Sequence, residues 1–177
     1  MKQKAEHIIL IGMPGSGKST VGVLLAKALG CGFADTDLHI QQHTGKKLYE
    51  TIRDGGLTSF LALECDTVCA YAPTEPAVIA TGGSVVLEPE AMEHLGRLGT
   101  VVYLQLPLSE VEHRIRNITT RGIAMAPGES LADVYALRAP LYERYADVTV
   151  SAAGQTLEET VHAVLAALNH LSEKAPE

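Results

Sequence analysis

The chain has 177 residues, of which 46% are hydrophobic and 20% are charged. This length fits a single domain, residues 1–177, and the apolar share is too high for an intrinsically disordered protein. The 14 basic and 21 acidic side chains give a net charge of −7. That sign argues against a protein that binds nucleic acid polymers, because such proteins present excess positive charge to the phosphates.

The apolar segments of the chain are short. The first, residues 8–11, holds four strongly apolar residues, too few for the apolar region of a signal peptide or for a membrane span. We therefore expect a soluble, cytoplasmic protein without membrane contacts, and a monomer in preference to an oligomer.

Short apolar runs alternate along the chain with longer segments of helical spacing. The runs that predict strands are residues 8–11, 32–35, 78–80, 101–106 and 148–150. The segments that predict helices are residues 21–29, 57–70, 110–118, 131–145 and 157–171. This alternation, with strands that are apolar throughout, predicts an α/β fold with a parallel sheet covered by helices on both faces. Residues 119–129 lack a period and predict a mobile loop.

The first predicted strand runs directly into Gly-Met-Pro-Gly-Ser-Gly-Lys-Ser at residues 12–19, which matches the phosphate-loop pattern GxxxxGK[ST]. Glycines let the backbone N–H groups of such a loop point at phosphate oxygens, and the helix that follows adds its positive end. Lys18 is expected at the terminal phosphates of ATP, and the Ser19 hydroxyl on Mg²⁺. The residues expected to bind the nucleotide are Gly12, Pro14, Gly15, Ser16, Gly17, Lys18, Ser19 and Thr20.

Several classes of phosphate-loop protein do not fit the rest of the chain. A guanine-reading Asn-Lys-x-Asp motif is absent, since the chain has only two asparagines, Asn117 and Asn169, and neither has that context. The apolar runs around residues 77–81 and 101–105 do not end in the acid that is typical of motor ATPases. A small-molecule kinase is the class that remains.

The second predicted strand ends in two alternating acids, Asp35 and Asp37. Ligands of parallel sheets lie beyond the carboxyl ends of the strands, so both acids are expected at the site. We expect Asp35 on the Mg²⁺ side, directly or through water, and Asp37 on the hydroxyl that attacks ATP, which it would orient and deprotonate. The alternative is that Asp37 merely caps the helical pattern that begins after it.

The order and spacing of five features resemble the shikimate kinase family over nearly the whole chain. They are the phosphate loop at 12–19, Asp35-Thr36-Asp37, Thr81-Gly82-Gly83, Arg121, and Arg138-Ala139-Pro140-Leu141-Tyr142. The resemblance implies a three-layer kinase fold with five parallel strands in the order 2-3-1-4-5 and a mobile lid at about residues 114–129. It also implies transfer of a phosphoryl group from Mg·ATP to a hydroxyl of shikimate.

The same resemblance assigns roles by position. Lys18 and Arg121 would stabilise the transferring phosphoryl group, with Arg121 also contacting the nucleotide. Gly82 and Gly83 would let backbone N–H groups approach the acceptor, and Arg138 would bind its carboxylate in a bidentate fork. Arg114 and Arg116 precede the loop and are either nucleotide contacts or surface residues of a helix.

Three positions depart from the family pattern. Leu61 follows Phe60 where the family has an arginine that holds the shikimate carboxylate, Thr81 replaces the first glycine of a triplet, and Gly122 replaces the proline after Arg121. Because the departures fall mostly on the residues expected to bind the acceptor, the sequence leaves two candidate acceptor molecules. One is shikimate held by Arg138 alone, and the other is a smaller hydroxylated acid such as homoserine. A third hypothesis, from another class, is a nucleotide-binding relative without catalysis.

Overall fold

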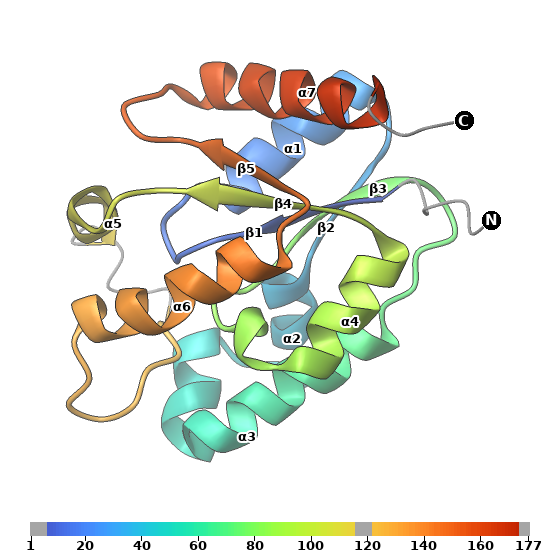
Figure 1. The fold of residues 1–177 in the computed structure, drawn as a ribbon. Coiled ribbons are helices and arrows are strands. Elements are labelled where there is room, and N and C mark those ends of the chain that lie inside the picture. Colours follow the sequence, from blue (N-terminus) through green and yellow to red (C-terminus); the bar gives the residue numbers. More distant parts are fainter. Residues whose placement is uncertain (1–6, 116–121, 174–177) are drawn as a thin grey trace.

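The computed structural model describes residues 7–115 and 122–173 of the chain (Figure 1). The strands are β1 (His7–Ile11), β2 (Gly32–Asp35), β3 (Ala77–Ala80), β4 (Gly99–Gln105) and β5 (Val148–Ser151). The helices are α1 (Lys18–Leu29), α2 (Thr36–Thr44), α3 (Leu48–Ala70), α4 (Pro89–Leu98), α5 (Leu108–Ile115), α6 (Leu131–Tyr145) and α7 (Leu157–Glu173), with a short 3₁₀ helix η1 (Val85–Leu87).

The strands form one five-stranded sheet in the order β2-β3-β1-β4-β5, and every neighbouring pair is parallel. The predicted order is confirmed. β1 lies in the middle, where Ile9 pairs with Ile79 of β3 on one side and with Val101 of β4 on the other. All five strands point the same way, so their carboxyl ends lie along one edge of the sheet (Figure 1).

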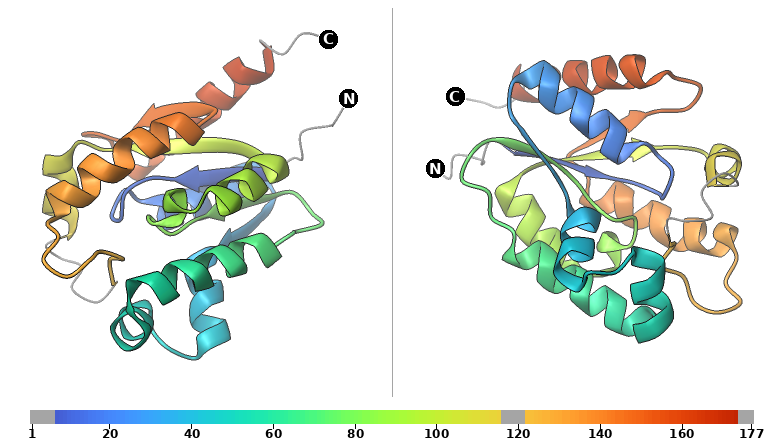
Figure 2. Two further views of the ribbon diagram at one scale, coloured as in Figure 1. Left: turned by 60° about the horizontal axis from the view of Figure 1, so that its bottom comes forward. Right: turned by 180° about the vertical axis from the view of Figure 1, so that it is seen from behind.

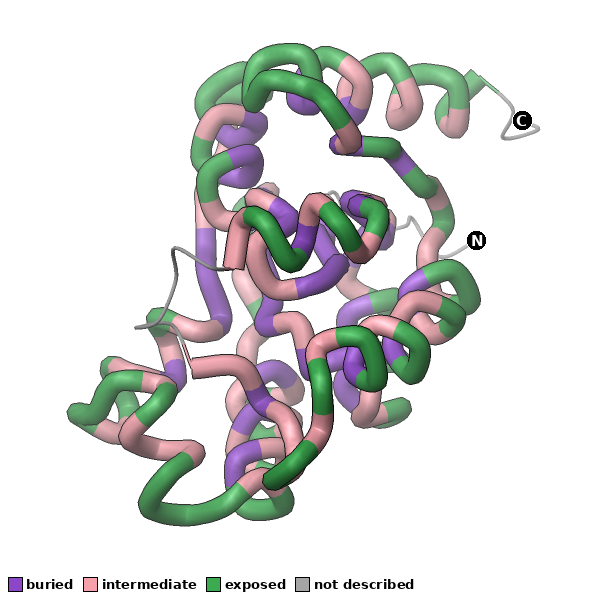
Figure 3. The backbone as a smooth tube through the Cα atoms, turned by 90° about the vertical axis from the view of Figure 1, so that its left-hand side faces the viewer, coloured by how far each residue is buried: buried purple, intermediate pink, exposed green. Residues whose placement is uncertain are grey.

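Alternate residues of β1 belong to two different cores. Ile9 and Ile11 pack in a cluster with residues of α3, α4 and α6, whereas Leu10 packs with residues of α1 and α7. Figure 2 shows these two layers of helices on opposite faces of the sheet. Figure 3 shows that the exposed stretches of the helices lie on the outside of the molecule. The continuous apolar runs of the sequence therefore reflect burial on both faces.

The helices depart from the predicted ones mainly on the face that carries α2, α3 and α4. The predicted helix over 57–70 is the second part of α3, which starts earlier, at Leu48, and is interrupted at Gly56 with φ 77° and ψ 169°. α4 and η1 were not predicted. α5 ends at Ile115, and the remaining residues of its predicted range, 116–118, lie outside the described residues.

No helix within residues 7–115 and 122–173 is long and apolar enough to cross a membrane.

Two leucines of α1 provide a matched test of the core beneath this helix. Leu25 is fully buried and Leu29 is 44% exposed. We expect Leu25→Ala to lower the free energy of unfolding by about 3 kcal/mol, because it removes buried methyl groups and leaves a cavity. Leu29→Ala should cost well under about 1 kcal/mol. Urea denaturation of both variants measures the difference, and equal losses would contradict the packing of α1 described above.

Candidate active site

A cavity of about 640 Å³ lies at the carboxyl ends of β1, β2 and β3. Its walls come from the phosphate loop, the starts of α2 and α3, the turn after β3, residues 122–124 and α6. This volume is in the range that encloses small metabolites and cofactors. Segments far apart in the sequence therefore contribute to one site.

The phosphate loop closes around the side chain of Lys18. The Lys18 ammonium donates hydrogen bonds to the carbonyl oxygens of Gly12 and Met13, at 2.8 and 2.9 Å, and lies 3.4 Å from the Ser16 hydroxyl. Lys18 is only 7% exposed and begins α1. Its charge is thus held inside the loop at the start of α1, which is where a phosphate-binding site places a cation.

The hydroxyl of Ser19 donates a hydrogen bond of 2.6 Å to Oδ2 of Asp35. The other carboxylate oxygen of Asp35 accepts a hydrogen bond of 3.0 Å from the backbone N–H of Asp37, which makes Asp35 the N-cap of α2. The alternative assignment of the cap to Asp37 is therefore wrong. Asp37 lies in the first turn of α2 and is one of the residues that line the cavity. A hydroxyl and a carboxylate side by side are the hard oxygen ligands that suit Mg²⁺.

The turn after β3 brings two acids close together. A side chain carbon added to Gly82 would overlap Oε1 of Glu64 and lie 2.9 Å from Oδ1 of Asp37. A larger residue here would have to displace one or both carboxylates, whereas glycine leaves them room. Gly83 follows, and its carbonyl oxygen accepts a hydrogen bond from the Tyr142 hydroxyl.

Glu64 is fully buried behind this turn, and sequence reasoning missed it. Its Oε2 accepts a hydrogen bond of 2.6 Å from the Ser84 hydroxyl, while Oε1 has no hydrogen-bond partner among the described residues. Burial raises the pKa of the Glu64 carboxyl to about 7; the Ser84 hydrogen bond and Arg138 oppose the rise, and Asp37 adds to it. Glu64 lies four residues from Phe60 and four from Val68, on the buried side of α3. An acid between two apolar residues at this helical spacing was the signal that could have revealed it.

Arg138 of α6 supplies a buried positive charge to the cavity. Arg138 is 2% exposed, and one of its guanidinium nitrogens donates a hydrogen bond to the carbonyl oxygen of Ala124. Nε and Nη1 have no hydrogen-bond partner among the described residues. Unpartnered donors on a buried cation that lines a cavity form a ready site for an anion, because an oxyanion can accept hydrogen bonds from them.

Arg114 lies beside the phosphate loop. Its guanidinium is 3.5 Å from the carbonyl oxygen of Gly15 and forms an ion pair with Glu110 at 3.3 Å. Arg116 and Arg121 lie outside the described residues. The expectations for these two arginines and for the mobility of the lid therefore stay predictions.

The sequence model of the family described as shikimate kinase matches residues 14–169. The chain belongs to the shikimate kinase family. A shikimate kinase from Mycobacterium avium is 40% identical over 148 residues, which cover 82% of this chain and 84% of that protein. A shikimate kinase from Thiobacillus denitrificans is 36% identical over 156 residues, 87% of this chain and 85% of that protein.

Among solved structures, the shikimate kinase from Acinetobacter baumannii in complex with shikimate matches with a TM-score of 0.84 at 28% identity. The match covers 98% of this chain and 97% of that chain. The protein is thus a small-molecule kinase of a family that uses ATP.

Two departures from the shikimate kinase pattern have a local physical explanation. Thr81 is 3% exposed, and its hydroxyl donates a hydrogen bond of 2.9 Å to the carbonyl oxygen of Leu10, so the branched side chain is held against β1. Gly122 has φ +52° and packs against the backbone of Tyr49, where an added side chain carbon would be 2.6 Å from the Tyr49 nitrogen. Proline cannot adopt that φ, because its ring fixes φ near −65°.

Leu61, the third departure, is partly buried and packs against the small apolar cluster that contains Phe60, Ile40 and Ala124. Phe60 lines the cavity, and Leu61 is not among the lining residues.

The elevated pKa of Glu64 predicts a pH dependence of folding. Because the unfolded chain releases this proton near the ordinary pKa of 4.5 and the folded protein near about 7, the contribution of Glu64 to stability is fully present below pH 4.5 and is lost as pH rises through this window. Glu64→Gln stays neutral, so the unmodified protein should lose about 3 kcal/mol relative to it between pH 4.5 and 7. Urea denaturation across pH measures this, with the exposed Glu158→Gln as control. Parallel profiles for the unmodified protein and Glu64→Gln would contradict the assignment.

Proposed function

We propose that the protein transfers the terminal phosphoryl group of ATP to a hydroxyl of shikimate, giving shikimate 3-phosphate and ADP. The observation that carries the proposal is the buried, partly unpartnered guanidinium of Arg138 in the same cavity as the phosphate loop. Shikimate carries one carboxylate, and its oxygens can accept from the unpartnered N–H groups of this guanidinium. The family and its relatives named shikimate kinase support the same acceptor.

On the nucleotide side, the phosphate loop from Gly12 to Thr20 binds the phosphates of ATP. Lys18 exchanges its contacts with the loop carbonyls for the phosphate oxygens and stabilises charge on the transferring group. Ser19 and Asp35 hold Mg²⁺, which neutralises phosphate charge when bound. Arg121 adds a second cation to the transferring group, as its position in the family pattern implies.

On the acceptor side, Asp37 accepts a hydrogen bond from the attacking hydroxyl and takes its proton. The hydroxyl oxygen forms a bond to the terminal phosphorus, and the bond from that phosphorus to the bridging oxygen of ADP breaks. Arg138 binds the carboxylate, and the backbone at Gly82 and Gly83 lies close to the acceptor. Holding the acceptor at both ends orients the hydroxyl, which is the main contribution a protein makes to this reaction.

Homoserine, the other acceptor that the sequence leaves open, is less well supported. It was motivated by Leu61 in place of the family's carboxylate-binding arginine, whereas the relatives carry the name shikimate kinase. A binder without catalysis would not need Asp37 at the acceptor end of the site.

We also propose that the protein acts in the cytoplasm, where ATP is supplied, and as a monomer. The large exposed apolar side chains of the described residues are spread over α1, α2, α3, α6 and α7 and form no single array on one element. Light scattering of the purified protein tests the monomer.

Mutation of the two central residues tests the reaction. We expect Lys18→Ala and Asp37→Asn each to reduce shikimate-dependent ADP release by at least tenfold, because each removes charge from the reacting groups. The exposed Asp66→Asn is the control for a carboxylate lost elsewhere, and circular dichroism checks the fold. Near-normal turnover in either variant would remove that residue from the chemistry. Turnover with homoserine but not with shikimate would overturn the proposed acceptor.

A further inference from the structure

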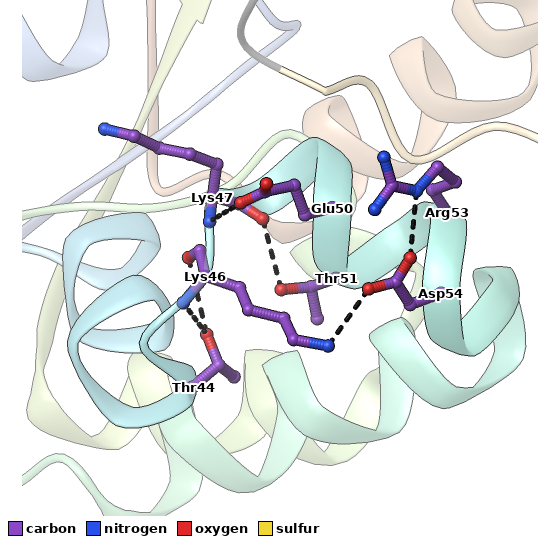
Figure 4. A network of polar contacts seen from close by, with 7 residues as sticks. All are labelled: Thr44, Lys46, Lys47, Glu50, Thr51, Arg53 and Asp54. Atoms are coloured by element: carbon purple, nitrogen blue, oxygen red, sulfur yellow. Dashed lines mark hydrogen bonds and ion pairs between the residues drawn. The ribbon is translucent and has the colours of Figure 1, made fainter.

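Adjacent lysines in the loop between α2 and α3 have different surroundings. The Lys46 ammonium forms an ion pair of 3.0 Å with Asp54. Asp54 also binds Arg53 at 2.9 Å, so Lys46 belongs to a charge network on the outside of α3. Figure 4 shows this network together with Lys47, whose ammonium points away from the other six residues.

Lys47 is instead one of the residues that line the cavity. Its backbone N–H donates to Glu50 at 2.8 Å and its carbonyl oxygen accepts from Thr51, so the base of the side chain is fixed at the start of α3. Within residues 7–115 and 122–173, no hydrogen bond or ion pair engages the Lys47 ammonium. A cation at a cavity wall without an acidic partner is available to a ligand.

Three cations line the cavity in the part of the chain that the structure describes, namely Lys18, Lys47 and Arg138. Lys18 is bound to the phosphate loop. Lys47 and Arg138 come from the start of α3 and from α6, and both lie on walls that the nucleotide loop does not form. The position from which the family's second carboxylate-binding arginine would come holds Leu61, which carries no charge.

We propose that Lys47 supplies the second positive charge for the carboxylate of the acceptor, in place of the arginine that is absent at position 61. The inference rests on the proposed function and adds a specificity-determining residue to it. Arg138 binds the carboxylate with two donors in a fixed fork, whereas Lys47 approaches as a single charge on a flexible stem. The pair gives the carboxylate two positive charges, where Arg138 alone would give one.

A comparison of Lys47→Met with Lys46→Met tests the inference, since the two variants remove the same charge from neighbouring positions. Both residues are exposed, so both variants should fold, which thermal unfolding checks. ADP release is measured against shikimate and against ATP. We expect Lys47→Met to raise the KM for shikimate at least tenfold, with the KM for ATP and kcat within twofold, and Lys46→Met to leave all three within twofold.

The methyl ester of shikimate, which lacks the negative charge, provides a second readout. Lys47→Met and the unmodified protein should use the ester with KM values within twofold of each other, because the lysine then has no carboxylate to bind. Equal effects of Lys46→Met and Lys47→Met, a rise in the KM for ATP as large as that for shikimate, or the same loss with the ester would each overturn the inference.

The proposed function fails separately, and visibly, if the unmodified protein shows no shikimate-dependent ADP release; the inference then falls with it. If the unmodified protein is active, the double variant Lys47→Met, Leu61→Arg tests the exchange of one cation for the other. We expect its KM for shikimate to return to within threefold of the unmodified value. A folded double variant with the KM of Lys47→Met would overturn the exchange.

Discussion

Hydrogen bonds along both sides of β1 position the residues that line the cavity. They hold the strand between β3 and β4 in a sheet whose strands are all parallel. The phosphate loop that leaves β1 is thereby brought beside the acids that follow β2 and the glycines that follow β3. Because both faces of β1 are buried, a shift in register would carry apolar side chains out of two cores at once, so the site geometry is fixed by packing that lies far from the ligands.

The charged side chains in the two halves of the cavity differ in how completely the protein itself supplies their hydrogen-bond partners. On the nucleotide side, Lys18 is bound by loop carbonyls and Ser19 by Asp35. Near α6 and the turn after β3, Arg138 keeps two unpartnered donors and Glu64 one unpartnered oxygen among the described residues. A buried charge without partners is costly in free energy, and an arriving anion relieves part of that cost. This half of the cavity therefore offers a charged site before any ligand binds.

Strands and the phosphate loop could be predicted because their signals are local. Apolar runs mark buried parallel strands, and the spacing of glycines and Lys18 marks the loop, whereas the strand order came from the family resemblance. The first turns of α3 were missed because Gly55 and Gly56 interrupt the apolar period of the helix. The sequence could not predict that Lys46 forms an ion pair while Lys47 lines the cavity. The difference depends on the direction of each side chain and on the position of Asp54, seven or eight residues along the chain.

The coupling between Arg138 and Glu64 has a consequence for the heat of binding. The positive charge of Arg138 lowers the pKa of Glu64, which is nevertheless about 7. An anion on the guanidinium offsets that charge, so the pKa of Glu64 rises and the protein takes up a fraction of a proton near neutral pH. By reciprocity, the anion binds more tightly as pH falls toward 6. The binding enthalpy measured at pH 7 then depends on the ionisation enthalpy of the buffer, although no group of the ligand changes its own protonation.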